Sequence, residues 1–247
     1  MAETTSTLSG DAAIVTGASS GIGRETALAL AREGVDVTLA ARREERLDAL
    51  ADRIERETDV TAIAVPTNVR DEDGVEALVE TAVDRFGGLD ILLNNAGVVV
   101  GGDIEELSTE KYRLMMETNA DGMFFATRAA LPHLRESGGT LVFIGSFAGQ
   151  YARSYNPAYA ATKWWARGFA QSVAAQTGGD VAVTTINPSE VRTEIAAETG
   201  RSFAERFDED EAIEPEDVAE AVVFAAGQEN AMVSELDLYR RDKFSVL

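Results

Sequence analysis

Short runs of aliphatic and β-branched residues alternate along the chain with longer stretches in which apolar residues recur every three or four positions. The short runs are typical of buried strands, and the longer stretches are typical of amphipathic helices. We predict strands over 12–15, 35–40, 61–65, 89–93, 140–144, 181–186 and 233–238. We predict helices from the first glycine turn to residue 33 and over 44–58, 71–85, 109–133, 159–176 and 215–226, with an interruption near Asp121-Gly122.

This regular alternation of strand and helix is the pattern of βαβ units, whose strands lie parallel in one sheet. We therefore predict an α/β, doubly wound Rossmann fold, with a seven-stranded parallel sheet flanked by helices on both faces. No linker, repeat or low-complexity block divides residues 1–247, so a single domain is expected. The segment 193–214, rich in Glu, Ala and Gly, is predicted to be a mobile flap over the functional site.

The charge balance is strongly acidic, with 43 Asp and Glu against 22 Lys and Arg and a net charge of −21. Acidic residues recur along the whole chain, for example in 42–57, 71–84 and 205–220, which indicates an acidic surface and not an acidic tail. Such a surface repels nucleic acid and anionic lipid, so neither is an expected partner. One interpretation is a mildly acidic cytoplasmic protein. We favour adaptation to high salt, because salt screens the self-repulsion.

Composition also excludes several kinds of chemistry. The chain has no cysteine, which excludes disulfides, thiolate catalysis and zinc–thiolate sites. Its one histidine, His133, is expected at the surface or at a helix end, and the carboxylates look dispersed, so we predict no catalytic metal. No run of 18 apolar residues occurs, and Met1–Thr5 lacks the start of a secretory signal. A cytoplasmic location without a membrane partner is therefore expected.

A glycine-rich turn follows the first predicted strand, in Thr16-Gly17-Ala18-Ser19-Ser20-Gly21-Ile22-Gly23. Glycines allow the backbone to approach a pyrophosphate closely, and a helix N-terminus offers free N–H groups and a positive dipole end. We expect Gly17, Ser19, Ser20, Gly21, Ile22 and Gly23 to bind a dinucleotide. The alternative is that these glycines only form a tight turn between strand and helix.

The end of the second strand indicates which dinucleotide binds. An NAD-binding site usually carries Asp or Glu there, whereas this chain continues with Arg42-Arg43. Guanidinium groups bind a 2′-phosphate through charge-assisted hydrogen bonds, which favours NADP(H). Glu44 and Glu45 follow directly and keep NAD(H) as the alternative, and both arginines could also be solvated residues of a first helical turn.

Tyr159 and Lys163 are four residues apart in a predicted helix, so they lie on one face of it. A neighbouring ammonium group favours the phenolate and can move a tyrosine toward acid/base function. Ser146 directly follows the fifth predicted strand, at the edge where parallel sheets place their sites.

These residues together resemble the short-chain dehydrogenase/reductase family over nearly the whole chain. Thr16–Gly23 is similar to its Thr-Gly-x-x-x-Gly-x-Gly pattern, and Asn94-Asn95-Ala96-Gly97 to its Asn-Asn-Ala-Gly. Asn119, Ser146, Tyr159 and Lys163 correspond to its catalytic tetrad in order and spacing.

The resemblance implies a role for each residue. Tyr159 exchanges a proton with the substrate oxygen, and Ser146 hydrogen-bonds that oxygen. Lys163 lowers the pKa of Tyr159 and holds the nicotinamide ribose, and Asn119 holds a water that links Lys163 to solvent. The further cofactor-binding residues implied are Asn68, Val69, Asn95, Ala96, Gly97, Pro188, Val191 and Thr193.

Two positions depart from the family pattern. Asn68 replaces an Asp that contacts adenine, and Ser189 replaces the Gly of a Pro-Gly pair, which puts the exact geometry of the loop after the sixth strand in doubt. Val191 and Thr193 keep their expected spacing in that loop.

The resulting prediction is an NADP(H)-dependent oxidoreductase that transfers a hydride between nicotinamide and a carbonyl/alcohol pair. Ketones, aldehydes, 3-oxoacyl thioesters and sugars or polyols remain open as substrates. A non-catalytic NADP-sensing interaction protein is the alternative. A homodimer or homotetramer is expected, with Trp164 or Trp165 at an interface. The expected borders of the substrate cleft are Phe147, Gln150, Tyr151, Tyr155 and Asn156.

Overall fold

Seven parallel strands form one sheet, in the order β3-β2-β1-β4-β5-β6-β7. The computed structural model describes residues 7–195, 201–208 and 211–245. The strands are β1 (Ala12–Thr16), β2 (Asp36–Ala41), β3 (Ala62–Pro66), β4 (Ile91–Asn94), β5 (Thr140–Ile144), β6 (Ala182–Pro188) and β7 (Glu235–Leu238). The predicted doubly wound fold is confirmed. The strand order reverses between β1 and β4, which is where such sheets bind their ligands.

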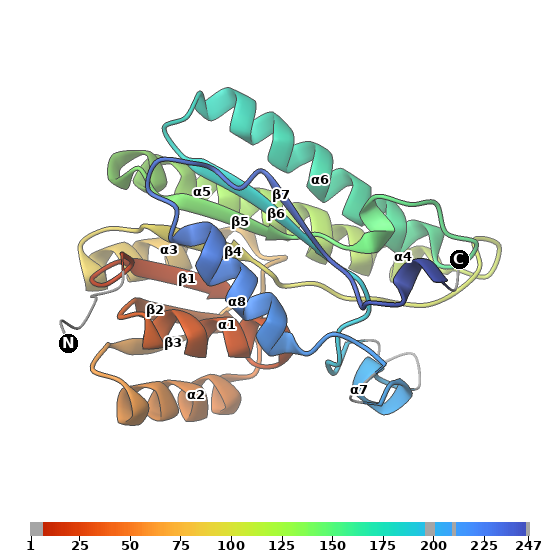
Figure 1. Ribbon diagram of the computed structural model, residues 1–247, viewed down its shortest axis with the longest axis horizontal. Helices are drawn as coiled ribbons and strands as arrows, with labels where there is room; N and C mark the ends of the chain where they lie inside the picture. Colours follow the sequence, from red (N-terminus) through yellow and green to blue (C-terminus); the bar gives the residue numbers. More distant parts are fainter. Residues whose placement is uncertain (1–6, 196–200, 209–210, 246–247) are drawn as a thin grey trace.

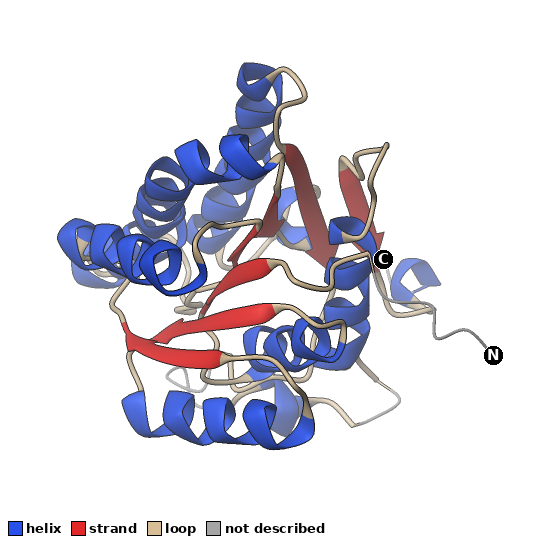
Figure 2. Ribbon diagram, turned by 90° about the vertical axis from the view of Figure 1, so that its left-hand side faces the viewer, coloured by secondary structure: helices blue, strands red, loops and turns tan. Residues whose placement is uncertain are grey.

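Helices cover both faces of the sheet (Figures 1 and 2). One face carries α1 (Gly21–Arg32), α2 (Glu44–Glu57) and α8 (Pro215–Ala226). The other carries α3 (Glu72–Phe86), α5 (Gly122–Ser137) and α6 (Pro157–Thr177). Side chains alternate between the two apolar layers: Ala13 and Val15 of β1 pack on the first face, and Ile14 packs on the second. Because both faces are buried, the strands are apolar throughout, which is the pattern that the sequence shows.

The interruption predicted near Asp121-Gly122 takes the form of a π-helical turn and not of a break between two helices. Helix α4 (Thr109–Met116) continues through a π-helical turn (Glu117–Asp121) directly into α5. Gly122 does not break the helix but allows close packing, since a Cβ atom there would lie 2.8 Å from Cγ2 of Val69. The helix also passes the predicted end at His133 and stops at Gly138, whose φ of 70° gives a left-handed C-cap.

The segment predicted as a flap is partly described. Its residues 196–200 and 209–210 lie outside the described part of the chain. The described part contains the short helix α7 (Phe203–Arg206), which begins with a capping box between Ser202 and Glu205. Figure 1 shows α7 beside the edge of the sheet where the strands end. Its mobility stays a prediction. None of the described helices combines the length and apolar character that a bilayer crossing requires.

Candidate active site

Two adjoining cavities open at the carboxyl ends of the strands. The larger has a volume of about 970 Å³ and contains Ser146, Tyr159 and Lys163 in its wall. The smaller, of about 420 Å³, is lined by the glycine turn, by Arg42 and Arg43, and by the loop after β3. Residues that line both cavities are Ile22, Asn95, Gly97, Val98, Val99, Thr193 and Ile195. The two cavities therefore form one cleft across the point where the strand order reverses.

The glycine turn lies tightly against the loop after β4. Gly17 has a φ of 70°, and a Cβ atom there would lie 2.7 Å from Nδ2 of Asn95. A Cβ atom on Gly23 would lie 2.6 Å from the same Asn95 atom. Ser20 is the N-cap of α1, but its side chain makes no capping hydrogen bond. Among the described residues the first N–H groups of α1 thus have no side-chain acceptor, and Gly21 and Ile22 line the smaller cavity, as an anion site requires.

Thr16 and Asn95 fasten the two strands on either side of this turn. The Thr16 hydroxyl donates to the Leu93 carbonyl across 2.9 Å and accepts from the backbone N–H groups of Asn95 and Ala96 at 3.0 and 3.1 Å. Asn95 Nδ2 donates to the Thr16 carbonyl at 2.8 Å. The cofactor-binding residues Asn95, Ala96 and Gly97 that the sequence predicts are therefore held in place from β1. Thr16 was not singled out as a site residue, although it begins the glycine pattern.

Arg43 makes most of the contacts at the predicted binding site for the 2′-phosphate. Its guanidinium donates to the hydroxyls of Ser19 (2.9 Å) and Ser20 (2.7 Å). It also donates to Oε2 of Glu194 at 2.9 Å, and Arg46 Nη1 donates to both oxygens of that carboxylate at 2.8 and 2.9 Å. Hydrogen bonds from Arg43 hold the pKa of Glu194 below its usual value. Arg42 is exposed and lines the same cavity.

The loop after β3 forms the opposite end of the smaller cavity. Asn68 lines it, and its Oδ1 accepts from the Arg70 N–H at 3.3 Å. Val69 is buried beneath, against Gly122. Asn68 thus stands where the resemblance places adenine recognition, with its side-chain nitrogen free of hydrogen bonds among the described residues.

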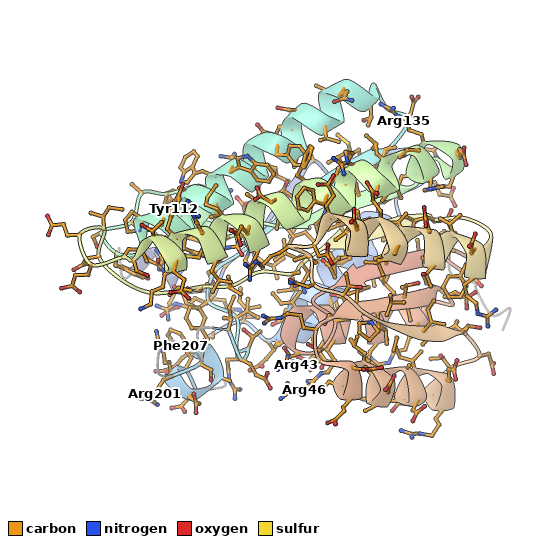
Figure 3. The ribbon with its side chains drawn as sticks, turned by 180° about the vertical axis from the view of Figure 1, so that it is seen from behind. Arg43, Arg46, Tyr112, Arg135, Arg201 and Phe207 are labelled. Atoms are coloured by element: carbon orange, nitrogen blue, oxygen red, sulfur yellow. The ribbon has the colours of Figure 1, made fainter. Side chains whose placement is uncertain are left out.

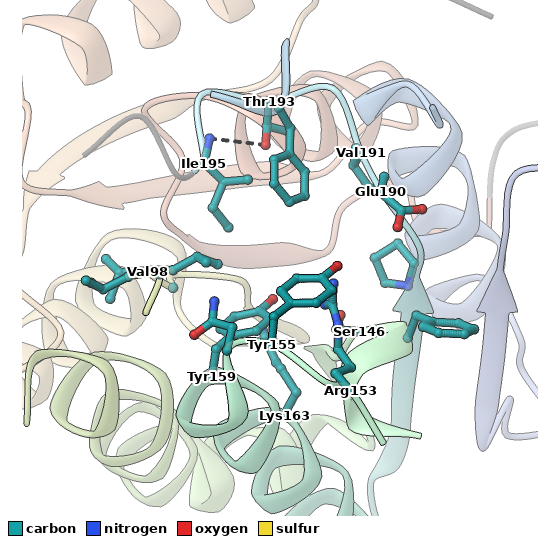
Figure 4. Close-up of a pocket in the computed structure, with 18 of the residues that line it drawn as sticks. Val98, Ser146, Arg153, Tyr155, Tyr159, Lys163, Glu190, Val191, Thr193 and Ile195 are labelled. Atoms are coloured by element: carbon teal, nitrogen blue, oxygen red, sulfur yellow. Dashed lines mark hydrogen bonds between the residues drawn. The ribbon is translucent and has the colours of Figure 1, made fainter. Parts of the chain in front are cut away.

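Tyr159 and Ser146 meet in the larger cavity (Figure 4). Tyr159 is only 9% exposed, and Ser146 begins a short 3₁₀ turn (Phe147–Gly149), with its hydroxyl accepting from the Ala148 N–H at 3.1 Å. Burial raises the pKa of Tyr159, while the hydrogen bond with Ser146 and the charge of Arg153 act in the opposite direction. A buried phenol with a raised pKa is protonated at neutral pH and can donate its proton.

Lys163 is buried one helical turn after Tyr159. Its ammonium lies 5.9 Å from the centre of the Tyr159 ring and donates to the Ile144 carbonyl at 2.8 Å. Burial lowers the pKa of Lys163 to about 8. The groups that lower the Tyr159 pKa here are Ser146 and Arg153, so the predicted action of Lys163 on this tyrosine stays a prediction.

Asn119 lies in the π-helical turn and is fully buried. Its Nδ2 donates to the Val98 carbonyl (2.9 Å) and to Oγ1 of Thr162 (3.1 Å), and its Oδ1 accepts from the Val98 N–H (2.8 Å). Both side-chain donors are thus used within the protein. Asn119 joins the loop after β4 to the helix that carries Tyr159 and Lys163, and a π turn at such a place is a frequent feature of functional sites.

The loop after β6 closes the cleft from the other side. Pro188, Val191 and Thr193 all line the larger cavity, and Thr193 Oγ1 accepts from the Ile195 N–H at 3.3 Å (Figure 4). Ser189, the departure from the family glycine, binds the C-terminal segment: its hydroxyl accepts from the Arg240 N–H at 3.1 Å, and its N–H donates to Leu238 at 2.8 Å. Ser189 therefore joins the loop after β6 to the C-terminal segment.

Three of the five residues expected to border the substrate cleft lie in the wall of the larger cavity. Phe147, Tyr155 and Asn156 line the larger cavity. Gln150 and Tyr151 are not in its wall: Gln150 donates to Asp237 at 2.8 Å, and Tyr151 stacks on the outer side of Phe147 with ring centres 4.5 Å apart. Both side chains contact the C-terminal segment instead. No local sequence pattern around Gln150 and Tyr151 predicts these distant contacts.

The two tryptophans and the one histidine of the chain lie outside the two cavities. Trp165 stacks on Phe169 at 4.7 Å and packs into the core, whereas Trp164 is 47% exposed on the surface of α6. His133 lies in α5 and lines neither cavity. In the described part of the chain, no three acidic or histidine side chains gather as a metal site would require. The prediction of no catalytic metal remains a prediction.

Three residues near the site gave no clear signal in the sequence. Arg153 lies in the wall of the larger cavity, and Glu194 binds Arg43 and Arg46. Glu190 lines the larger cavity as well and pairs with Lys243 at 2.6 Å. The partners of Glu194 and Glu190 are distant in sequence, so no local pattern indicates these contacts.

The glycine turn lies beside the point where the strand order reverses, and Tyr159, Ser146 and Lys163 lie in the adjoining cavity. Together these features define a dinucleotide-binding oxidoreductase fold. Comparison with known proteins agrees: the model of the short chain dehydrogenase family matches residues 11–202. The trans-4-hydroxycyclohexanecarboxylate dehydrogenase of Sinomonas cyclohexanicum is 31% identical over 232 residues, covering 92% of this chain and 89% of that protein.

Solved structures extend the likeness to nearly the whole chain. An alcohol dehydrogenase from the archaeon Thermococcus sibiricus, complexed with 5-hydroxy-NADP, superposes with a TM-score of 0.88 at 29% identity, covering 94% of this chain and 97% of that one. A 3-ketoacyl-(acyl-carrier-protein) reductase from Brucella melitensis, complexed with NADH, gives 0.84 at 26% identity, covering 95% and 98%. The chain belongs to the short-chain dehydrogenase/reductase family and is an oxidoreductase with a nicotinamide nucleotide site.

Proposed function

We propose that this protein transfers a hydride between NADP(H) and a carbonyl/alcohol pair, with Tyr159 as the general acid and base. The observation that carries the proposal is the meeting of Ser146, Tyr159 and Lys163 in a cavity that continues into the glycine turn. A silent NADP-sensing protein has no need of this buried group, which favours the enzyme over that alternative.

The cleft fits the cofactor along its length. The bare backbone at Gly17 and Gly23 and the uncapped start of α1 suit a pyrophosphate. Arg43, with Ser19 and Ser20, suits a 2′-phosphate, and this favours NADP(H) over NAD(H). Asn95 to Gly97 and the loop Pro188–Thr193 flank the passage between the two cavities. The bound nicotinamide supplies or accepts the hydride.

The protein's own part is to handle the proton on the substrate oxygen. Burial keeps Tyr159 protonated, so its hydroxyl donates a proton to the carbonyl oxygen in reduction and takes it back in oxidation. The Ser146 hydroxyl donates a hydrogen bond to the same oxygen and stabilises the charge that develops there. Lys163 places a positive charge under the site and holds the ribose. Asn119 keeps the tyrosine helix in register with the loop after β4.

Two of the similar proteins are named as a trans-4-hydroxycyclohexanecarboxylate dehydrogenase and an alcohol dehydrogenase. This supports an alcohol or carbonyl compound as the substrate here. A cavity of about 970 Å³ with Phe147 and Tyr155 in its wall suits a small or medium, partly apolar molecule. Ketones, aldehydes, 3-oxoacyl thioesters and sugars or polyols remain members of this class.

We also infer a cytoplasmic, salt-adapted enzyme that assembles as a homodimer or homotetramer. The net charge of −21 supports the salt adaptation. The assembly is supported by exposed aromatic side chains on adjacent helices, with Phe124 of α5 39% exposed and Trp164 of α6 47% exposed. The measured molar mass in concentrated KCl tests the assembly.

The proposed reaction is tested by following NADPH oxidation at 340 nm, in concentrated KCl, with a panel of ketones, aldehydes and sugars. We expect turnover with at least one class and a higher kcat/KM with NADPH than with NADH. A protein that binds NADPH but oxidises it with no member of the panel, and reduces NADP⁺ with none of the matching alcohols, contradicts the proposal.

A further inference from the structure

Arg153 stands apart from the other partly buried arginines in the described part of the chain. Arg53, Arg167, Arg192 and Arg240 each form an ion pair with a carboxylate. Among the described residues Arg153 has no hydrogen-bond or ion-pair partner, and its guanidinium stacks on the ring of Tyr155, 4.1 Å from the ring centre. In a chain with 43 carboxylates, an unpaired arginine away from bulk solvent is unusual.

The position of Arg153 places its charge at the reacting end of the cleft. It lines the larger cavity together with Ser146 and Tyr159, and Figure 4 shows it reaching toward them from beside Tyr155. Its charge acts on Tyr159, and burial lowers its own pKa below the usual value. The Glu190 carboxylate acts on Arg153 from a distance, and Glu190 is already bound by Lys243 at 2.6 Å.

We propose that Arg153 is the binding site for a carboxylate group on the substrate, so that the natural substrates are hydroxy or oxo acids. This deepens the proposed function and rests on it. A planar guanidinium binds a carboxylate through two parallel hydrogen bonds, and stacking on Tyr155 leaves the edge of the guanidinium free for them. Because Arg153 is partly buried, this attraction is screened by salt less than that of a fully exposed ion pair.

Two aldehydes of the same size test this proposal, since 4-formylbenzoate and 4-formylbenzamide differ mainly in charge. The 3-formyl pair is included to vary the distance between the aldehyde and the charge. We expect the wild-type enzyme to prefer one formylbenzoate over its amide by about tenfold or more in kcat/KM. In Arg153→Gln the ratio falls to near one, while Arg153→Lys keeps part of it. Arg135→Gln, an equal loss of charge at the far end of α5, leaves the ratio unchanged (Figure 3).

Binding of unreactive ligands separates this proposal from the proposed reaction. Benzoate should bind the NADPH-loaded protein more tightly than benzamide by a similar factor, and the difference should vanish in Arg153→Gln. If neither aldehyde is reduced but benzoate still binds more tightly than benzamide, the carboxylate site at Arg153 is supported, and the proposed reduction is contradicted for these aldehydes. Reduction of both aldehydes with no preference for the acids, or a preference that survives in folded Arg153→Gln, overturns the role of Arg153.

A separate observation concerns the mouth of the smaller cavity. The Glu194 carboxylate accepts from Arg43 (2.9 Å) and from Arg46 (2.8 and 2.9 Å), while Arg43 also contacts Ser19 and Ser20. Arg43 and Arg46 lie side by side at the start of α2 (Figure 3). Two guanidiniums converge here on one carboxylate, Glu194, which belongs to the chain itself, while the two serine hydroxyls accept from Arg43.

The geometry points to Glu194 as a built-in competitor for the 2′-phosphate of NADP(H), and to Arg46 as a further ligand of that phosphate. A phosphate carries more charge and more acceptor oxygens than a carboxylate, so it can displace Glu194 from both arginines. Glu194 sits between Thr193 and Ile195, which line the larger cavity. Cofactor binding would thus release a segment that also borders the reacting centre.

Calorimetric titration of 2′,5′-ADP and 5′-ADP tests the competition without any hydride transfer. In Glu194→Gln we expect 2′,5′-ADP to bind about three- to tenfold more tightly and 5′-ADP to be unchanged. In Arg46→Ala we expect 2′,5′-ADP to bind about tenfold more weakly, again with 5′-ADP unchanged. Glu57→Gln, which breaks an exposed pair with Arg53 on the same helix, is the matched control.

The outcomes separate the competition from the cofactor preference itself. If wild type does not prefer 2′,5′-ADP but Glu194→Gln does, the competition stands and the proposed NADP(H) preference fails. If Glu194→Gln weakens 5′-ADP binding, Glu194 is a ribose acceptor and the competition is overturned. Equal affinity of wild type and Glu194→Gln for 2′,5′-ADP also overturns it.

Discussion

Asn119 donates a hydrogen bond of 3.1 Å to Thr162, which lies between Tyr159 and Lys163 on α6. Thr162 in turn donates to the Tyr159 carbonyl at 2.8 Å. The π turn of one helix is thereby fastened to the turn of the other that carries the acid/base pair. A short chain of buried hydrogen bonds thus links the position of Tyr159, through Thr162 and Asn119, to the loop after β4.

We expect Thr162→Val to lower kcat by about ten- to hundredfold, because small displacements of reacting groups have large effects on rate. The free energy of unfolding should fall by about 1–3 kcal/mol, since Asn119 Nδ2 loses a buried partner. Thr127→Val is the matched control, because it breaks a similar buried bond of 3.0 Å with Asn94. Equal losses of kcat in the two variants at equal loss of stability would contradict a positioning role for Asn119 and Thr162.

We expect the buried charge of Lys163 to lower the free energy of unfolding of this protein. Its pKa falls from 10.5 to about 8 on burial, so the ionised side chain costs about 3 kcal/mol of folding free energy below pH 8. Without cofactor at pH 7, we expect Lys163→Met to unfold at higher temperature than wild type by an amount equivalent to about 2 kcal/mol, after the loss of the bond to Ile144. As pH rises from 8 toward 10.5, the folded wild type sheds this proton and the difference shrinks.

Thermal unfolding of both proteins at pH 7 and at pH 9.5 checks the sign. Lys111→Met serves as the control, since Lys111 is exposed on α4. A Lys163→Met variant that is less stable than wild type at pH 7, or a difference that does not change with pH, would show that the buried charge is not the cause.

Arg43 and Arg42 should differ in their effect on cofactor choice. Both side chains are exposed, but Arg43 bonds to Ser19 and Ser20 beside the glycine turn, whereas Arg42 has no hydrogen bond or ion pair among the described residues. We expect Arg43→Ala to lower kcat/KM for NADPH about tenfold or more and to leave NADH nearly unchanged. Arg42→Ala should have a smaller effect of the same kind. If Arg42→Ala changes the preference more than Arg43→Ala does, the assignment to Arg43 is wrong.

Salt should stabilise this protein strongly. With a net charge of −21, self-repulsion between surface carboxylates opposes folding at low ionic strength, and about 1 M salt screens it to about 3 Å. We expect the midpoint of thermal unfolding to rise by about 10 °C between 0.2 M and 3 M KCl, which for a chain of this size corresponds to a few kcal/mol. A midpoint that is already maximal in dilute buffer would refute the adaptation to salt.

Sequence patterns predicted those parts of the site that depend on short spacings. The glycine turn, the Tyr159–Lys163 pair and Ser146 after β5 are each set by neighbours in the chain, and the strand pattern shows which edge of the sheet they share. The fold followed because strands buried on both faces are apolar throughout, so they stand out from the helices.

Contacts between distant segments were not predictable in the same way. Arg43 and Glu194 are 151 residues apart, and nothing local marks either as the partner of the other. Gly122 resembled a helix breaker because its real role, contact with Val69, involves another element. The same holds for Lys163 and Ile144, whose bond depends on how α6 packs against β5.

Tyr159→Phe tests the central claim most directly, in single-turnover oxidation of enzyme-bound NADPH by a carbonyl substrate that wild type reduces. The variant removes one hydroxyl, and Tyr155→Phe removes a hydroxyl from the wall of the same cavity as a control. We predict that Tyr159→Phe binds NADPH normally but loses about 100-fold or more in the rate of hydride transfer, while Tyr155→Phe stays within a few fold of wild type. Hydride transfer at the wild-type rate in Tyr159→Phe would contradict the assignment of Tyr159 as the acid and base.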